Sequence, residues 1–150
     1  MTLGLTACGG QNGRPATATP AAYPTLDAAQ VAQGRQIYQQ HCAACHGGNA
    51  EGAPNWATPG PEGFSLPPPH DDSGHTWHHP DRVLHEVIRD GMSDPLRPGS
   101  PLRMPAFGDP LSEAEIRAVI EYFKSLWSAE HRQYQWEQTS KDVAPPPASP

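Results

Sequence analysis

Apolar side chains recur at helical spacing most clearly in residues 112–127. Ser112 and Glu115 stand three apart at the start of this stretch, a pattern typical of a capping box that closes the first turn of a helix. The apolar stripe that follows consists of Ile116, Val119, Ile120, Phe123 and Leu126, with Tyr122 and Trp127 beside it. The pattern predicts an amphipathic helix that buries this stripe.

A second helix is expected over residues 27–41, with Thr25 or Asp27 as its N-cap. Its predicted buried face consists of Val31, Gly34, Ile37 and Tyr38. A glycine inside a helix costs about 1 kcal/mol relative to alanine, so Gly34 indicates that another helix passes closely. We expect the first and last helices to cross there, with Gly34 under an aromatic side chain.

Two further helices are predicted. In residues 80–90, Pro80 suits the first helical position and Gly91 a C-terminal stop. The buried face of this helix is expected to consist of Val83, Leu84, Val87 and Ile88. Residues 128–141 continue as a short surface helix, and two of its aromatic side chains are interpreted as docking residues, Tyr134 and Trp136. Because no alternating β-branched strand is recognisable, the predicted fold class is all-α, with three to four helices.

Composition limits how much of the chain folds. Hydrophobic residues make up 36%, beside 19 prolines and 14 glycines, which is poor for a self-sufficient core. Residues 9–25 and 143–150 are low-complexity segments that bury too little apolar surface to order themselves. We therefore expect a flexible tether over residues 1–25, one domain over residues 26–130 and a Pro-rich C-terminal extension over residues 131–150.

The Pro-rich segment 47–79 is long for an irregular loop in a compact domain, which indicates that it wraps a ligand. The candidate ligand follows from the run Cys42-Ala43-Ala44-Cys45-His46, a pattern typical of covalent haem c attachment. Two thiols one helical turn apart add to the porphyrin vinyl groups, and the next side chain reaches the iron. The run predicts one covalent haem c, held by Cys42 and Cys45, with His46 as the proximal iron ligand.

Two other chemistries use paired cysteines. A thioredoxin-like dithiol needs a βαβ context, which no segment here offers. A structural zinc site normally has four protein ligands in compact pairs. The remaining cysteine, Cys8, precedes Cys42 by 34 residues and lies in a stretch that does not look folded. The haem interpretation is therefore favoured.

The run Leu5-Thr6-Ala7-Cys8, followed by two glycines, resembles the lipobox of bacterial lipoproteins, whose cysteine is acylated. The seven residues before Cys8 lack Lys and Arg and are too short for a secretory signal, so we expect the true start to lie upstream. No run approaches the roughly 18 apolar residues of a membrane span. Membrane association is therefore expected through lipid on Cys8.

The formal net charge is −6 at pH 7. This charge argues against nucleic acid or an anionic lipid surface as a direct partner. A redox partner protein with a basic docking surface fits the charge better.

The order of these elements resembles class I cytochrome c over residues 26–127. The motifs that carry the resemblance are Gly34 with Ile37-Tyr38, Cys42-Ala43-Ala44-Cys45-His46-Gly47, and Met104-Pro105-Ala106-Phe107 leading into Ser112. The resemblance implies a small helical fold around one haem, attached outside the cytoplasm. It also implies that Met104 is the distal iron ligand, with Met92 as the alternative, and that a loop proline carbonyl orients His46. Pro54 is the nearest candidate for that carbonyl.

A methionine suits the distal position because its thioether is a soft, neutral ligand that favours ferrous iron. Histidines are the alternative, and five of them crowd the middle of the chain: His70, His75, His78, His79 and His85. They could supply a His/His haem or a second metal such as copper, or they could be loop residues that hydrogen bond to backbone or to haem propionates. Trp77 or His78 is a candidate donor to a propionate.

With both axial positions filled, the expected function is one-electron transfer by a membrane-tethered carrier between respiratory redox partners. Two alternatives remain: a subunit through which electrons enter a larger oxidoreductase, and a gas sensor whose Met ligand is labile. An enzymatic role of its own is not expected, and neither is a small-molecule substrate. Asp71 and Asp72 are interpreted as turn and cap residues, since no nucleophile with a neighbouring base is recognisable.

Overall fold

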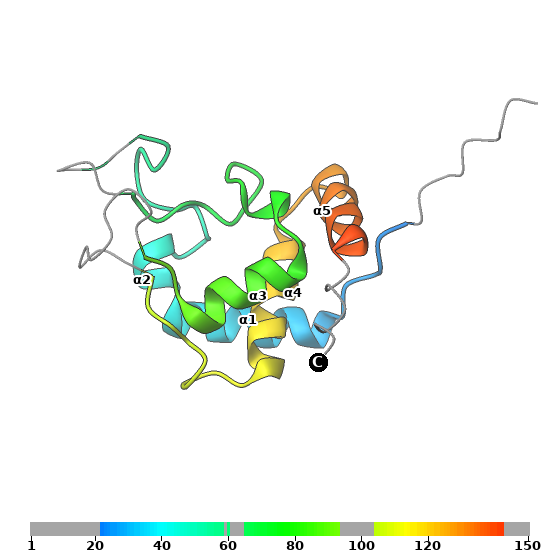
Figure 1. Ribbon diagram of the computed structural model, residues 1–150, viewed down its shortest axis with the longest axis horizontal. Helices are drawn as coiled ribbons and strands as arrows, with labels where there is room; N and C mark the ends of the chain where they lie inside the picture. The colour runs from blue at the N-terminus through cyan, green and yellow to red at the C-terminus, as the bar shows by residue number, and fades with distance from the viewer. Residues whose placement is uncertain (1–21, 59, 61–64, 94–103, 143–150) are drawn as a thin grey trace, which may run out of the picture.

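The computed structural model describes residues 22–58, 60, 65–93 and 104–142. Within these residues the fold is all-α, as predicted, and an isolated β-bridge pairs Met92 with Met104. The helices, shown in Figure 1, are α1 (Ala28–His41), α2 (Ala43–His46), the 3-10 turn η2 (Thr76–His78), α3 (Asp81–Asp90), α4 (Glu113–Ser125) and α5 (Ala129–Lys141). The run at Cys8 lies outside the described residues.

Helix α1 packs across α4, and the crossing lies at Gly34. Asp27 caps α1, since its Oδ1 accepts hydrogen bonds from the backbone N–H groups of Ala29 and Gln30 at 2.8 and 3.1 Å. A Cβ atom on Gly34 would overlap the backbone carbonyl of Ala118 and lie 3.0 Å from the Cβ of Tyr122. The predicted crossing is confirmed, but backbone as well as an aromatic residue lies against the glycine.

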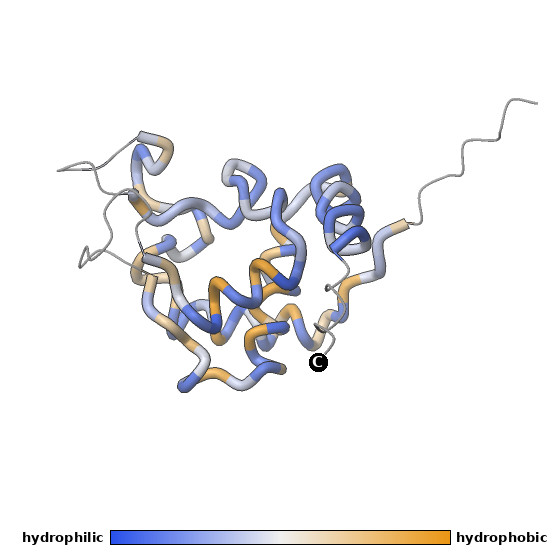
Figure 2. The backbone as a smooth tube through the Cα atoms, in the orientation of Figure 1, coloured by the Kyte–Doolittle hydropathy of each residue, from blue (hydrophilic) through white to orange (hydrophobic). Residues whose placement is uncertain are grey.

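Helix α4 supplies much of the core. Its capping box is complete, because Ser112 Oγ accepts from Glu115 N and the Glu115 carboxylate accepts from Ser112 N. The residues that α4 buries are Ile116, Ala118, Val119, Ile120, Tyr122 and Phe123. Figure 2 shows apolar residues gathered on α3 and α4, whereas α5 is mostly hydrophilic.

Helix α3 begins one residue later than predicted, because Pro80 is its N-cap with extended backbone (ψ 158°). Leu84 and Ile88 are buried, and Gly91 ends the helix with φ +72°. Lys124 of α4 lies 2.7 Å from the Asp81 carboxylate at the start of α3. This ion pair joins the two helices at one end.

Helix α5 lies on the opposite side of the molecule from α2 in Figure 1 and contacts η2. Its buried Gln135 donates to the Asp81 carboxylate at 2.6 Å and to the His79 carbonyl at 3.2 Å. The same helix also contacts the N-terminal segment, because the backbone N–H of Tyr23 donates to Gln133 and the Arg132 guanidinium lies 4.9 Å from the centre of the Tyr23 ring. The predicted domain end at residue 130 falls within this helix. No helix in the described part of the chain is long and apolar enough to cross a membrane.

Candidate haem site

The two cysteines of the haem-attachment run stand on a helical turn. Cys42 ends α1 and caps α2, and its carbonyl accepts from the backbone N–H groups of Cys45 and His46 at 3.1 and 3.0 Å. Neither cysteine forms a disulfide; Cys42 is partly buried and Cys45 is exposed. The run therefore folds as predicted, with the two thiols one turn apart.

The imidazole of His46 is buried, with 8% of the residue exposed. Its Nδ1 lies 2.9 Å from the Pro68 carbonyl, which only accepts hydrogen bonds, so Nδ1 carries the hydrogen and Nε2 is free to bind a metal. Burial lowers the pKa of His46 although the bond to Pro68 opposes this effect, and the ring is therefore neutral near pH 7. A neutral, oriented imidazole is what iron ligation requires.

The prediction that Pro54 orients His46 is wrong. The chain turns back directly after the run, because the Gly52 N–H donates to the His46 carbonyl at 2.7 Å and Gly52 has φ +72°. Pro54 is exposed after this turn. The Pro-rich loop returns later and brings Pro68 to the imidazole, since the Ala53 N–H donates to the Pro67 carbonyl at 2.9 Å.

Tyr38 holds the end of the attachment turn from α1. Its hydroxyl donates to the Gly47 carbonyl at 2.7 Å, and burial raises the pKa of this fully buried phenol, which keeps it a donor. Gly47 has φ +84°, a conformation that suits glycine. The turn that carries Cys45 and His46 is thus fastened to the helix that precedes it.

The thiol chemistry of the turn does not suit a redox-active dithiol. Burial, and then the neighbouring Cys45, raise the pKa of the Cys42 thiol to about 11, so it is protonated near pH 7. Reactive cysteines of Cys-x-x-Cys sites have lowered pKa values. Nor do any three His, Cys, Asp or Glu side chains of the described residues gather as a zinc or copper site requires.

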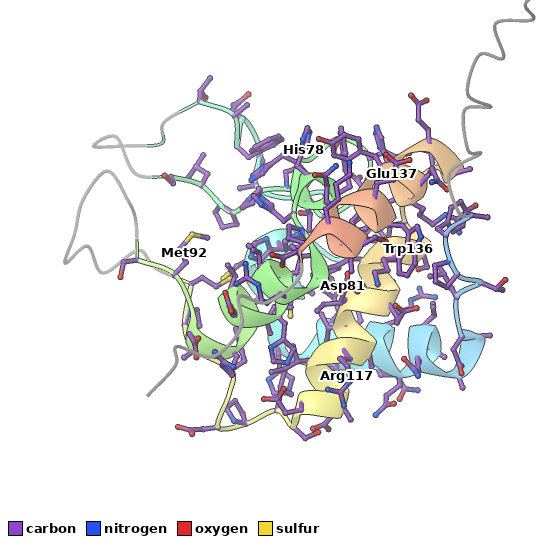
Figure 3. All side chains as sticks on the ribbon, turned by 45° about the vertical axis from the view of Figure 1, so that its right-hand side comes forward. His78, Asp81, Met92, Arg117, Trp136 and Glu137 are labelled. Carbon is purple, nitrogen blue, oxygen red and sulfur yellow. The ribbon has the colours of Figure 1, made fainter. Side chains whose placement is uncertain are left out.

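The segment that carries Met104 is fastened to the end of α3. Met92 and Met104 exchange two backbone hydrogen bonds of 3.0 Å, and the Phe107 N–H donates to the Ile88 carbonyl at 3.0 Å. The Phe107 ring also lies 6.1 Å from the ring of His41, next to the attachment run. Met104 is partly buried against the core, whereas Met92 is 49% exposed and lies at the margin of the described structure in Figure 3.

The crowded histidines of the loop and of α3 contact neighbouring aromatic and acidic side chains. His75 stacks on Trp56 at 5.6 Å, and His78, labelled in Figure 3, stacks on Trp77 at 3.8 Å. The indole N–H of Trp77 donates to the Gly74 carbonyl at 3.0 Å, which favours His78 over Trp77 as the candidate donor to a propionate. His85 Nε2 lies 2.7 Å from the Glu113 carboxylate.

The paired aspartates shape the same loop. Asp71 accepts from the Ser73 backbone N–H at 2.9 Å and from its hydroxyl at 2.6 Å, which forms a turn. Asp72 accepts from the Ser128 N–H at 2.8 Å and lies 2.7 Å from Nδ1 of His131. The interpretation as a turn residue is confirmed for Asp71, whereas Asp72 caps no helix of its own and joins the loop to the start of α5.

Two residues of this site, Pro68 and Trp127, were not assigned a function from the sequence, and His70 was named only as one of five candidate histidines. Pro68 supplies the orienting carbonyl, His70 lies with its ring centre 4.3 Å from that of His46, and Trp127 donates its indole N–H to the His70 carbonyl at 2.8 Å. Nothing local distinguishes Pro68 from its proline neighbours or His70 from the other histidines. Trp127 was predicted to flank the core stripe, and it is buried there with 3% exposed.

The donor set fits a covalently bound haem: two unpaired thiols on a helical turn and a buried, neutral imidazole whose Nε2 is free for iron. Together with the all-α fold, this site defines the class of protein as a cytochrome c domain. The family described as "Cytochrome C oxidase, cbb3-type, subunit III" matches residues 29–123, and the chain belongs to this family. Membership implies a covalently bound haem c. Cytochrome c domains are typically electron carriers.

The chain is also similar to the Cbb3-type cytochrome c oxidase subunit CcoP of Azospirillum sp. (strain B510). The two are 32% identical over 100 residues, which cover 67% of this chain and 30% of that relative. The chain thus matches less than a third of the relative's length. Helix α5 lies beyond the family match.

Proposed function

We propose that this chain holds one haem c through thioethers to Cys42 and Cys45, with His46 and Met104 as axial iron ligands, and carries single electrons between respiratory redox partners. The observation that carries the proposal is the buried His46 beside the cysteine turn, with Nδ1 bonded to the Pro68 carbonyl. When bound, the haem supplies a one-electron couple.

Each protein ligand contributes a distinct property. The Pro68 carbonyl, by accepting the Nδ1 hydrogen of His46, raises the basicity of Nε2 and fixes its direction. Met104 offers a soft thioether that favours the reduced state. Its partial burial and the bonds that fasten its segment to α3 favour it over the exposed Met92.

Filling both axial positions with protein leaves no open site for a substrate, which favours electron transfer over catalysis. The paired carboxylates of the described residues agree, since Asp71 holds a turn and Asp72 holds the start of α5. No small-molecule substrate is proposed.

The proposed location is extracytoplasmic, at a membrane to which lipid on Cys8 ties the chain. Confinement to a surface raises the effective concentration of a carrier near membrane partners. The formal net charge of −6 favours partners with a basic docking surface, and their association should weaken with added salt. Nucleic acid is not a proposed partner.

The similarity to an oxidase subunit favours a second candidate, in which this domain is a fixed part of a larger oxidoreductase through which electrons enter. The two candidates share the haem site and differ in assembly. Recovery of a stoichiometric partner after purification in mild detergent would favour the fixed subunit, whereas a monomeric carrier is expected to purify alone.

The proposed site is tested with purified protein produced in cells that attach haem c. Haem should stay with the polypeptide through denaturing electrophoresis, and it should be lost from a Cys42→Ala, Cys45→Ala double variant. The ferrous protein should bind carbon monoxide slowly or not at all, since Met104 occupies the distal position. Rapid carbonylation of the native protein would contradict electron transfer at a closed site and support a gas sensor.

A further inference from the structure

A second histidine lies against the proposed proximal ligand. The ring centre of His70 is 4.3 Å from that of His46, with 31° between the planes, and 4.3 Å from the ring of Phe123 on α4, with 22° between the planes. Tyr38 meets the His70 ring edge-on at 6.5 Å. The His70 ring is therefore stacked on an aromatic residue of the core and lies, tilted, against the proximal imidazole.

Two linked hydrogen bonds fix the orientation of the His70 ring. Its Nδ1 lies 2.9 Å from Oγ1 of the buried Thr76, and that hydroxyl donates to the Pro69 carbonyl at 3.2 Å. Because the hydroxyl hydrogen goes to the carbonyl, the oxygen accepts from His70, and Nδ1 of His70 carries the hydrogen. These two bonds therefore fix both the orientation and the tautomer of the ring.

The backbone of His70 is fastened as well. Its N–H donates to the Ala50 carbonyl at 2.8 Å, and its carbonyl accepts from the indole N–H of Trp127 at 2.8 Å. Pro68, whose carbonyl accepts from His46 Nδ1, lies only two residues earlier. The same short segment thus touches the proximal imidazole through the His70 ring and through the hydrogen bond to Pro68.

This geometry does not suit His70 as an iron ligand. Two imidazoles that bind one iron from opposite sides point their nitrogens at each other across the metal, whereas the rings of His46 and His70 lie against each other, tilted by 31°, with a ring-centre distance of 4.3 Å. Nδ1 of His70 is also engaged by Thr76. His70 is therefore placed to act through His46.

We infer that His70 is a positioning residue for the proximal ligand, which sets the plane of the His46 imidazole and keeps the Pro68 carbonyl in reach of Nδ1. The inference rests on the proposed role of His46 as an iron ligand. A strong Nδ1–H···O bond makes the imidazole a better donor and favours ferric iron. Loosening the ring and the carbonyl therefore favours ferrous iron and raises the reduction potential.

The test uses holoprotein with His70→Leu, and His79→Leu as a matched control in the same loop. His79 contacts Gln135 through its carbonyl, which the substitution keeps. In His70→Leu the equilibrium ratio of ferrous to ferric protein at a given potential should rise about tenfold, which raises the reduction potential by about 59 mV for a one-electron couple. The rhombicity of the low-spin ferric electron paramagnetic resonance spectrum should change too, because it reports the plane of the axial imidazole. His79→Leu should match the wild type in both measurements.

A second pair of variants keeps the inference testable if His70→Leu does not fold. Thr76→Val removes the partner of His70 Nδ1 and should shift the potential in the same direction, whereas Thr76→Ser should restore the wild-type value. Wild-type potential and spectrum in folded His70→Leu, or equal shifts in His70→Leu and His79→Leu, would overturn the inference. If His70→Leu does not fold, the absence of any shift in Thr76→Val would overturn it. A wild-type protein with no histidine-ligated haem would refute the proposed function itself, which separates the two failures.

Discussion

Replacing Gly34 by alanine tests the packing that supports the haem run. In an isolated helix this substitution is favourable by about 1 kcal/mol, since alanine has the highest helix propensity. Here the added Cβ would overlap the Ala118 carbonyl of α4 and approach the Tyr122 Cβ at 3.0 Å. A backbone carbonyl inside a helix does not swing away as a flexible side chain does, so α1 and α4 must separate.

The magnitude follows from these two opposing effects. Overpacking a well-filled core costs typically 1–3 kcal/mol, and contact with backbone places this site near the upper value, about 3 kcal/mol. Subtracting the gain in helix propensity of about 1 kcal/mol leaves a net loss of about 2 kcal/mol. Gly48 offers a matched control, because a Cβ there would meet no atom within 4 Å. Gly48→Ala should therefore change stability by less than about 0.5 kcal/mol.

The assay is urea unfolding of the two holoprotein variants, followed by far-ultraviolet circular dichroism. Gly34→Ala should unfold at a clearly lower urea concentration than the wild type, with a similar slope, and Gly48→Ala should overlay the wild type. A Gly34→Ala protein as stable as the wild type or more stable would refute the reasoning, because the added Cβ would then cause no loss of packing between α1 and α4.

Two further predictions concern single contacts. Trp127→Phe keeps an aromatic ring in the core but removes the donor to the His70 carbonyl, so the free energy of unfolding should fall by about 1–2 kcal/mol. An unchanged free energy in urea unfolding would contradict a stabilising role of this hydrogen bond. Hydrogen bonds from the Ser112 side chain and backbone lower the pKa of Glu115 below its ordinary value of 4.5. The Glu115 carboxylate therefore stabilises the fold fully at pH values above 4.5, and this stabilisation is lost as the pH falls through the lowered pKa. Glu115→Ala should therefore be less stable than the wild type at neutral pH, and the difference between their melting temperatures should become smaller at acid pH. A difference that does not change with pH would count against the capping box.

The helices were predictable because their signals are local. The capping box of α4, the Gly91 stop and the helical turn of the attachment run depend on residues a few positions apart. The start of α3 was placed one residue early because Pro80 lacks an N–H and so suits either side of a helix boundary. Such errors leave the fold unchanged.

The environment of His46 was not predictable in the same way. The hydrogen bond from its imidazole to Pro68 spans 22 residues. Pro68 is the middle one of three consecutive prolines, and the sequence does not show which of their carbonyls accepts the bond. Only the return of the loop across Ala50 and Ala53 selects which carbonyl meets the ring. The stacking of His70 depends on the same return, and also on Phe123, which a different helix supplies.

The most direct test of the proposed His46/Met104 pair is the near-infrared absorption band of the ferric protein that reports a methionine sulfur on iron. The account predicts this band in the wild type and in Met92→Ala, and its loss in Met104→Ala. Because Met92 pairs with Met104 through two backbone hydrogen bonds, its substitution by alanine keeps both bonds and serves as the matched control. A band that survives Met104→Ala, or one that disappears in Met92→Ala alone, would contradict the assignment of the distal ligand.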